Sequence, residues 1–311
     1  MTRDLLKDEV WLNKWTNFEE SALSDRLSII ATPAVNRLYE PQYLKDTGFH
    51  NIRLLLLRYS RGDNMEELSQ YFEPLLHYWE ESERLGKGVW TPEQWRIRHT
   101  WSVNLDFFID CFWVIGLALA LEIPDQQWQR LVALIGNEGE DALLDKIIAT
   151  RSPLRKIGQS LCYPKPYGRL LDALYADPSA RPRLLSKFVE NWYKEIGSAA
   201  KSGREKKAVP FKAPYWYNYH RVDGGYFGYW CLEAVAAVKA FGLDDSLCLG
   251  HPNYPGDLLR PGAVTVSDIR RLPAELVSAI GAEPDPPFLG VPKKITNWEA
   301  FKLAVKNISK N

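Results

Sequence analysis

Residues 224–259 restrict the possible folds of this chain more than any other stretch. They open with glycines and aromatic residues in the order GGYFGYW and continue through alanines at positions 234, 236, 237 and 240. A period of about 3.6 residues predicts one helix that carries Phe227, Trp230 and Phe241 on a single face and ends at Gly242. Because alanine side chains are small, a second helix can approach this one closely. We therefore expect a core of packed helices.

The same helical period recurs along most of the chain. Trp11, Trp15 and Phe18 share one face of a helix expected over residues 5–30, and the next helix should end at Gly62. Further apolar patterns predict shorter helices near residues 128–135, 143–148, 167–175 and 184–196. No segment has the alternating pattern of a strand. The predicted fold class is all-α, with several helices in a bundle-like arrangement.

Local signals indicate how some of these helices begin or bend. Asn64 with Glu67 three residues later is a capping-box pattern, which predicts the start of a third helix. Pro74 lies inside that helix and predicts a kink. The Thr-Pro pair at 91–92 predicts the start of a long central helix that ends before Pro124.

Segments rich in proline and polar residues divide the chain. We expect two helical domains, over residues 1–150 and 151–259, followed by a loop-rich extension over residues 260–311. Residues 201–207 are expected to form a basic linker, and a capping pattern at Thr296 predicts a last helix in the extension.

Composition excludes several classes of protein. With 311 residues, 46% of them hydrophobic, the chain can bury a large core, and its 39 basic and 39 acidic residues give no net charge that would favour nucleic acid or membranes. The N-terminus lacks the apolar run of a signal peptide, and the apolar run at 111–121 is shorter than the roughly 18 residues of a membrane helix. The four cysteines form no Cys-x-x-Cys pair, so we expect reduced core thiols. We expect a cytoplasmic protein with no direct nucleic-acid or membrane partner.

The sequence offers few candidates for chemistry. No histidine has the spacing of a metal site, and no serine or cysteine has the surroundings of a catalytic nucleophile, so we expect no catalytic residue, metal or cofactor. Asp106 and Asp110 lie one helical turn apart and could serve a metal or an acid/base pair, although carboxylates on a helix more often cap or form ion pairs.

Glu233, His251 and Asp257 are the main polar residues of the 224–259 stretch. If one cleft held all three, they could support a hydrolase-like enzyme, and this is the alternative function. A carboxylate in an aromatic helix more often accepts hydrogen bonds from tyrosine or indole groups, because leaving it without them would cost several kcal/mol. We therefore favour a structural role for six residues of this stretch: Tyr229, Trp230, Glu233, His251, Tyr254 and Asp257. The HPNYP segment at 251–255 is then a rigid turn docked on the helix, with His251 and Tyr254 donating inward.

Two groups of motifs resemble a known protein family. GYFGYW at 225–230 with Glu233, GLDD at 242–245 and HPNYPxDL at 251–258 resemble the C-terminal signature of the PoNi-type immunity proteins. In the N-terminal half, the similar segments are Arg3-Asp4 with Asp8-Glu9, RYSRGD at 58–63 and NEGEDALL at 137–144. The resemblance spans about residues 3–259, and this chain departs from it in Gly224 and in the residues after Leu259.

The resemblance implies a mostly helical, cytoplasmic protein without enzymatic activity. Such a protein binds and neutralises a cognate antibacterial nuclease toxin, commonly one delivered by a type VI secretion system. The partner toxins often have a restriction-endonuclease-like fold that engages DNA through basic residues. An inhibitor could fill that DNA cleft with carboxylates and aromatic rings, or it could block self-association of the toxin, and the sequence leaves both open.

Two places are candidates for binding this partner. Glu80, Glu81 and Glu83 form an acidic edge near a predicted helix end, and Asp223 with Tyr226 places an aromatic anchor beside a carboxylate. Nucleic-acid binding through the basic linker is a weaker alternative, because the chain lacks a groove-reading motif. A homodimer also remains open, since the 12 tryptophans would serve a dimer interface as readily as a toxin interface.

Overall fold

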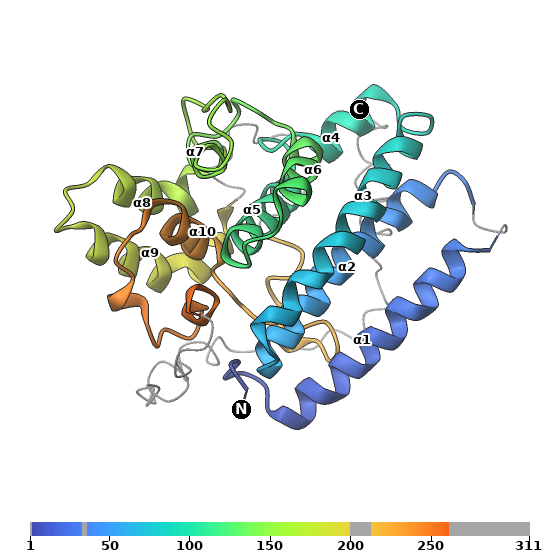
Figure 1. Ribbon diagram of the computed structural model, residues 1–311, viewed down its shortest axis with the longest axis horizontal. Helices are drawn as coiled ribbons and strands as arrows, with labels where there is room; N and C mark the ends of the chain where they lie inside the picture. Colours follow the sequence, from blue (N-terminus) through green and yellow to red (C-terminus); the bar gives the residue numbers. More distant parts are fainter. Residues whose placement is uncertain (1, 33–35, 200–212, 261–311) are drawn as a thin grey trace. The chain divides into compact units, whose positions relative to one another are not determined.

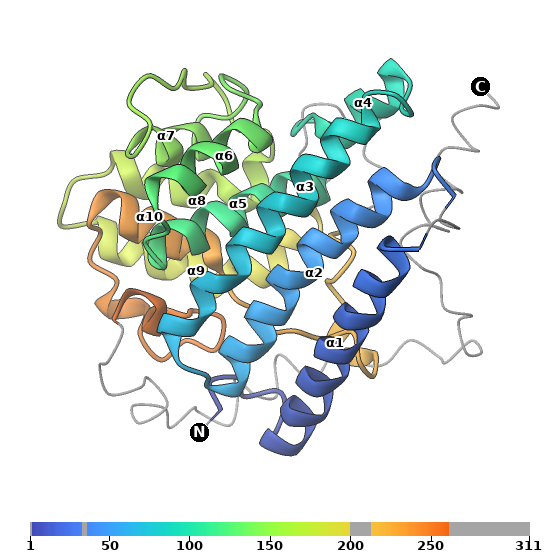
Figure 2. The ribbon, with the colours of Figure 1, turned by 45° about the vertical axis from the view of Figure 1, so that its right-hand side comes forward.

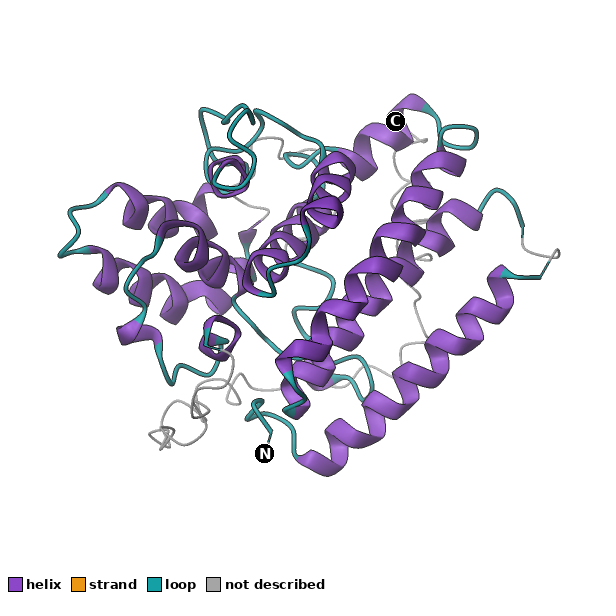
Figure 3. Cartoon of the chain, viewed as in Figure 1, coloured by secondary structure: helices purple, strands orange, loops and turns teal. Residues whose placement is uncertain are grey.

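The computed structural model describes residues 2–32, 36–199 and 213–260. They belong to one compact unit, Met1–Asp268. Every regular element among them is a helix, which confirms the all-α prediction (Figure 3). The division at residue 150 stays a prediction. The expected basic linker and the C-terminal extension with its helix at Thr296 lie outside the described residues.

Three N-terminal helices lie side by side, with α2 between the other two (Figures 1 and 2): α1 (Glu9–Ile30), α2 (Glu40–Arg61) and α3 (Phe72–Gly86). The carboxylate of Asp8 accepts a hydrogen bond from the Trp11 N–H at 2.8 Å, so α1 begins later than residue 5. Gly62 ends α2 in the left-handed conformation, with φ of 105°, as predicted. α1 buries only Leu12 and Thr16, which places it at the edge of this layer.

The other helices build the second part of the unit. They are α4 (Pro92–His99), α5 (Leu105–Ala120), α6 (Asp125–Ile135), α7 (Leu144–Ala149), α8 (Pro164–Tyr175), α9 (Arg181–Ile196) and α10 (Leu232–Phe241). Short 3-10 helices add to them: η1 (Met65–Tyr71), η3 (Tyr219–Arg221), η4 (Ser246–Cys248) and η5 (Gly256–Leu259). α8 packs against α9, and α5 packs against α10. The helices expected near 128–135, 143–148, 167–175 and 184–196 are therefore all present as α6 to α9.

α5 and α10 approach each other closely in the core. A β-carbon added to Gly116 on α5 would lie 2.7 Å from the carbonyl oxygen of Leu232 and 3.4 Å from the β-carbon of Ala236. The glycine and the alanines together let the two backbones meet, which is the close approach expected from the alanine pattern. α5 is buried along almost its whole length by this packing.

The long helix expected from residue 91 to Pro124 is wrong, because the chain breaks it in two. Its start is confirmed, since Thr91 and Gln94 form a complete capping box at the beginning of α4. α4 ends at His99, and α5 begins anew at Leu105, where the side chain of Asn104 accepts a hydrogen bond from the Phe107 N–H at 3.0 Å.

Two other local predictions are also wrong. The third helix does not begin at Asn64, because η1 intervenes, and Pro74 then falls in the first turn of α3, where its missing N–H disrupts no helical hydrogen bond. The helix expected to include Phe227 and Trp230 begins only at Leu232, and residues 226–231 form no regular element.

Candidate functional site

The aromatic segment before α10 wraps around Ser60, a fully buried residue near the end of α2. The Ser60 hydroxyl accepts a hydrogen bond from Trp230 Nε1 at 2.9 Å and donates one to the carbonyl oxygen of Phe227 at 3.3 Å. Between these two contacts, Gly228 has φ of 104°, and a β-carbon there would lie 2.1 Å from Trp230 Nε1. The segment cannot be helical, because its backbone turns at Gly228 to reach Ser60 from both sides.

Arg3 joins the N-terminus to two distant segments. Its Nη1 donates hydrogen bonds to the carbonyl oxygens of Tyr59 at 3.0 Å and Asp63 at 2.9 Å. Its Nε lies 3.3 Å from Asp257 Oδ2. The ion pair therefore brings the first residues, the end of α2 and the end of the 224–259 stretch together.

Asp4 makes a second connection of the same kind. Its backbone N–H donates to the carbonyl oxygen of Ser60 at 3.1 Å, and its buried carboxylate accepts a hydrogen bond from the Tyr226 hydroxyl at 2.6 Å. Burial raises the pKa of the Tyr226 phenol well above its usual value, and the nearby Asp4 carboxylate adds to the rise. Tyr226 is thus held as a neutral donor in the core.

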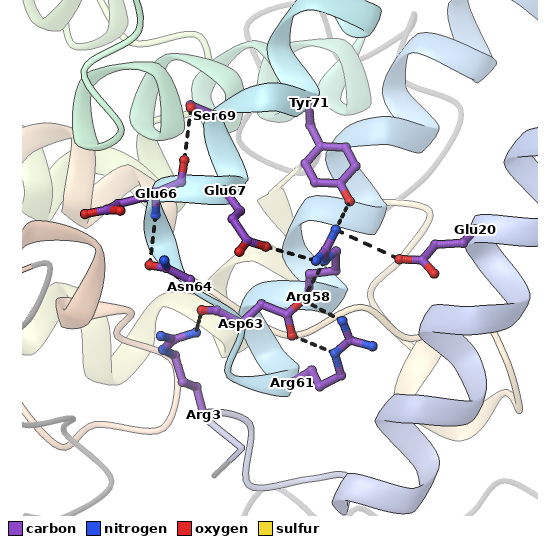
Figure 4. Close-up of polar contacts among 10 residues, drawn as sticks. All are labelled: Arg3, Glu20, Arg58, Arg61, Asp63, Asn64, Glu66, Glu67, Ser69 and Tyr71. Carbon is purple, nitrogen blue, oxygen red and sulfur yellow. Dashed lines mark hydrogen bonds and ion pairs between the residues drawn. The ribbon is translucent and has the colours of Figure 1, made fainter.

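Arginines of α2 gather carboxylates beside this cluster (Figure 4). Arg58 donates to Asp63 at 2.5 Å, to Tyr71 at 2.7 Å and to Glu67 at 3.4 Å, and it lies 4.0 Å from Glu20 of α1. Arg61 also donates to Asp63, at 2.5 Å. Burial favours the protonated carboxyl of Asp63, but hydrogen bonds from Arg61 and Arg58 outweigh it and lower its pKa. The cluster is therefore a network of ion pairs at the end of α2.

The HPNYP turn docks on the start of α10 through Asn253. The carbonyl oxygen of Asn253 accepts a hydrogen bond from the Cys231 N–H at 2.8 Å, and its side-chain Nδ2 donates to the carbonyl oxygen of Tyr229 at 2.8 Å. Tyr254 donates inward, to Asp245 Oδ2 at 2.5 Å. His251 Nδ1 accepts a hydrogen bond from the Asn253 N–H at 3.2 Å, within the turn itself. In the sequence, the only sign of this role of Asn253 is its place between the two prolines of the turn.

Glu233 is enclosed in the core near the beginning of α10. It is fully buried, and its Oε1 accepts a hydrogen bond from the Tyr167 hydroxyl of α8 at 3.1 Å. Burial raises the pKa of this carboxyl to about 7, while the Tyr167 hydroxyl and the indoles of Trp192 and Trp113 oppose the rise. Among the described residues, neither indole makes a hydrogen bond of ordinary geometry, and Oε2 has no hydrogen-bond partner. The residue is a costly buried acid surrounded by donors.

The three residues of the alternative enzyme have separate partners. Glu233 contacts Tyr167, His251 accepts from Asn253, and Asp257 lies against Arg3. A substrate would have to displace core side chains to reach the carboxylate of Glu233, which has no exposed surface.

Asp106 and Asp110 lie on the side of α5 that faces Arg53 of α2. Asp106 accepts a hydrogen bond from the Tyr215 N–H at 3.1 Å. Burial raises the pKa of Asp106 to about 6 and that of Asp110 to about 7, and the charge of Arg53 opposes both shifts. Tyr215 in turn accepts a hydrogen bond from Arg53 Nε at 3.1 Å. The pair is part of the packing between α2, α5 and the segment after residue 213.

The three glutamates of the expected acidic edge point to different partners. Glu80 forms an ion pair with Arg130 at 2.8 Å, and Glu81 forms one with Arg84 at 2.7 Å. Glu83 is turned inward, with its side chain 16% exposed, and accepts hydrogen bonds from Trp79 Nε1 and His99 Nε2. The three glutamates therefore do not form one acidic edge. Glu80 and Glu81 are paired with arginines at the surface, and Glu83 is mostly buried.

The other candidate pair is also divided. Asp223 is exposed and accepts a hydrogen bond from Trp11 Nε1 of α1 at 3.4 Å. Tyr226 is only 3% exposed, because its ring packs against Trp11 and Tyr229. Asp223 is therefore the member of the pair that a partner could reach.

The described residues offer neither a metal site nor a membrane-spanning helix. No group of three or more His, Cys, Asp or Glu side chains there could hold a metal ion. None of the helices in these ranges is both long and apolar enough to cross a membrane. All four cysteines are buried and free.

Comparisons with known proteins agree with the sequence resemblance. Residues 3–133 match the family described as "PoNe immunity protein (PoNi), N-terminal", and residues 139–258 match "PoNe immunity proteins (PoNi), C-terminal". The crystal structure of protein PA2201 from Pseudomonas aeruginosa has a similar fold, with a TM-score of 0.60 and 20% identity over 83% of this chain and 89% of that chain. A comparison with curated proteins found no match. Because the two family matches cover most of its length, this chain belongs to the PoNe immunity protein (PoNi) family.

Proposed function

We propose that this protein neutralises a cognate nuclease toxin by binding it stoichiometrically. Family membership over residues 3–258 is the observation that carries the proposal. The burial of Glu233 supports a binding protein over the hydrolase-like alternative, because a catalytic carboxylate must be reached by its substrate.

The internal contacts of the signature residues suggest that these residues stabilise the fold and that other residues contact the toxin. The side chains of Ser60, Asp4 and Asn253 form hydrogen bonds with other segments of the same chain. Groups engaged in this way stabilise the fold and have little left for a partner. Toxin contact then falls on exposed side chains around the signature.

The stoichiometry of inhibition tests this function. The nuclease toxin encoded beside this protein would be titrated with the full chain while cleavage of plasmid DNA is followed. We expect activity to fall linearly to zero near one chain per toxin molecule, with a stable complex in gel filtration. Heat-denatured chain is the control. Inactivation of many toxin molecules by each chain would favour an enzyme, and undiminished cleavage at excess chain would remove the proposal.

The proposed place of action is the cytoplasm. A type VI secretion system would deliver the toxin from neighbouring cells, and this protein would neutralise it in the cytoplasm, where nuclease and DNA meet. A strain without the chain should be outcompeted by its parent only when the parent's secretion system is active. Protection should return with the native chain, but fail with a chain directed to the periplasm by an added signal peptide.

The mode of inhibition has two forms. The protein either covers the DNA-binding surface of a toxin with a restriction-endonuclease-like fold or prevents that toxin from associating with itself. DNA binding by a cleavage-deficient toxin separates them: covering the surface abolishes binding, whereas blocking self-association leaves binding by the toxin monomer intact.

A further inference from the structure

The exposed apolar residues of this protein gather in one region. Among the described residues, more than half of the large apolar side chains that remain exposed lie between residues 5 and 39: Leu5, Val10, Phe18, Leu27, Ile29, Leu38 and Tyr39. Phe18 is 53% and Ile29 47% exposed, although both belong to a regular helix with a neighbour. Concentrated exposed apolar surface is typical of an interaction site.

Apolar residues repeat at positions i, i+4, i+7, i+11 and i+18 along one side of α1, and these are Trp11, Trp15, Phe18, Ala22 and Ile29. We name this stripe, together with Asp25 and Asp223, the α1 face. α1 packs mainly against α2 and lies at the edge of the helical layer (Figure 2). Among the described residues no second helix covers the stripe, and Phe18 and Ile29 are its most exposed members, whereas Trp11 and Trp15 are partly buried.

Contacts with residues 223–226, which we name the 223–226 loop, hold the aromatic part of the α1 face in place. The ring centroid of Trp15 lies 5.9 Å from that of Trp11 and 5.2 Å from that of Phe18. A β-carbon added to Gly224 would lie 2.3 Å from the Trp15 ring, so this glycine lets the indole rest on the loop backbone. Rings fixed in this way lose little conformational freedom on binding, which makes them suitable anchors.

The charges around the α1 face favour a basic partner over a second copy of this chain. The exposed charged side chains of α1 are three acids, Glu9, Glu20 and Asp25, and one base, Lys14. Asp25 lies one helical turn before Ile29, and the exposed Asp223 lies beside Trp11, whereas Lys7 and Lys14 lie over the rings of Trp11 and Trp15 at 4.8 Å. A nuclease must carry a cationic surface to hold the phosphates of DNA. Asp25 and Asp223 can meet such a surface, whereas two copies of α1, each with more exposed acids than exposed bases, would repel each other.

We infer that the α1 face is the surface that binds the cognate nuclease toxin, an inference that rests on the proposed function. Trp11 and Phe18 are the aromatic anchors, Ile29 extends the apolar contact, and Asp25 and Asp223 meet basic side chains of the toxin. The 223–226 loop supports this surface from behind and adds one side chain, Asp223, to the toxin contact.

Paired substitutions in the full-length chain test the inference against the toxin encoded beside it. Phe18→Ser with Ile29→Ser removes apolar area from the α1 face. Leu154→Ser with Tyr175→Ser is the matched control, since these side chains are 97% and 67% exposed elsewhere. We expect toxin affinity to fall about tenfold or more for the first pair, as for central interface residues, and to stay within about twofold for the control. Melting temperatures of all variants should match the wild type, because none of the four side chains is buried.

Charge reversal gives an independent readout. Asp25→Lys with Asp223→Lys should slow association with the toxin several-fold at low salt and less at high salt, because steering by charge is screened. Asp172→Lys with Asp177→Lys, on the exposed surface near α8, serves as the control.

The outcomes separate the inference from the proposed function. If the wild-type chain inhibits the toxin and both α1 pairs bind it as tightly and as fast as their controls, the α1 face is overturned while the function stands. If the wild-type chain does not bind the toxin, both are overturned. A homodimer that is lost with Phe18→Ser and Ile29→Ser, while toxin affinity is unchanged, would assign the face to self-association and also overturn the inference.

Discussion

The hydroxyl group of Ser60 connects α2 to the aromatic segment before α10. Its replacement by alanine would leave Trp230 Nε1 and the carbonyl oxygen of Phe227 in the core without their present hydrogen bonds. Because unsatisfied buried groups are costly, Ser60→Ala should lower the free energy of unfolding by about 2 kcal/mol, measured by urea denaturation. Ser28→Ala on the exposed side of α1 should change it by less than about 0.5 kcal/mol. Equal effects of the two substitutions would contradict the role of Ser60.

Glu233 gives the protein a specific dependence of stability on pH. Its carboxyl has an ordinary pKa of 4.5 and a folded-state pKa raised to about 7 by burial. The folded protein therefore holds this proton at pH values where the unfolded chain has lost it. The contribution of Glu233 to stability is largest below pH 4.5 and falls by about 3 kcal/mol as the pH rises to 7.

Glu233→Gln removes this titration. Relative to the wild type, the variant should gain about 3 kcal/mol in free energy of unfolding between pH 4 and pH 8, measured by denaturation at both values. Toxin neutralisation should be retained, because the residue is structural. Comparing variant with wild type cancels the parallel titrations of Asp106 and Asp110, whose pKa values are also raised.

Tyr167→Phe is the companion to this test. It removes the hydroxyl that donates to Glu233 Oε1, and this hydrogen bond is strongest when the carboxyl is ionised. The loss of stability should therefore be greater at pH 8 than at pH 4. A pH-independent loss in this variant, or a pH-independent difference for Glu233→Gln, would show that Glu233 does not titrate near neutral pH in the folded state.

At the level of elements, two helical glycines should respond to alanine in opposite directions. Gly116→Ala on α5 would place a β-carbon 2.7 Å from the Leu232 carbonyl oxygen, whereas a β-carbon on Gly168 of α8 would meet nothing within 4 Å. Alanine gains about 1 kcal/mol in helix propensity at either site, but overpacking at Gly116 costs about 1–3 kcal/mol. We expect Gly116→Ala to lower and Gly168→Ala to raise the melting temperature, and a rise in both would mean that α5 and α10 do not meet closely.

Helix ends were predicted correctly where the residue at the end itself determines the backbone conformation. Gly62 and Gly242 end α2 and α10 because only glycine adopts the left-handed conformation there without strain, and this requirement is visible in the sequence. The aromatic run at 226–230 has a helical period, yet it is not helical. Its conformation is set by hydrogen bonds to Ser60, which lies more than 160 residues earlier.

At the scale of the molecule, the described residues before and after position 150 share one core. α5 and α10 lie on opposite sides of the boundary expected at residue 150, and Arg3 forms an ion pair with Asp257 across the same boundary. Each half would expose the apolar face that the other covers. Residues 1–150 and 151–260 produced separately should therefore lack a cooperative thermal transition, while the full chain should unfold with coincident far-UV and near-UV circular dichroism signals.

The control for this prediction is a chain cut after Arg260, which retains both halves. It should unfold as cooperatively as the full-length protein. A sigmoidal transition in either isolated half would instead support two independent domains.

The candidate site was harder to predict than the fold. Glu80, Glu81 and Glu83 read as one acidic edge, but Arg130 neutralises the first from another helix and Glu83 turns inward toward His99. The apolar stripe of α1 was visible as a period, since Trp11, Trp15 and Phe18 were expected on one face. The exposure of this stripe could not be predicted, because a hydrophobic period alone does not tell whether a second element covers the helix face.

The sequence by itself determined the all-α fold class, the ends of two helices at glycines and the family, because each depends on residue types at short spacing. Only the tertiary structure decided that Glu233 is enclosed, that Tyr226 is buried while Asp223 is exposed, and that α1 lies at an edge. Local conformational preferences act over a few residues, whereas burial depends on which distant segments meet. The order of residues specifies those meetings only through the packing of the whole core.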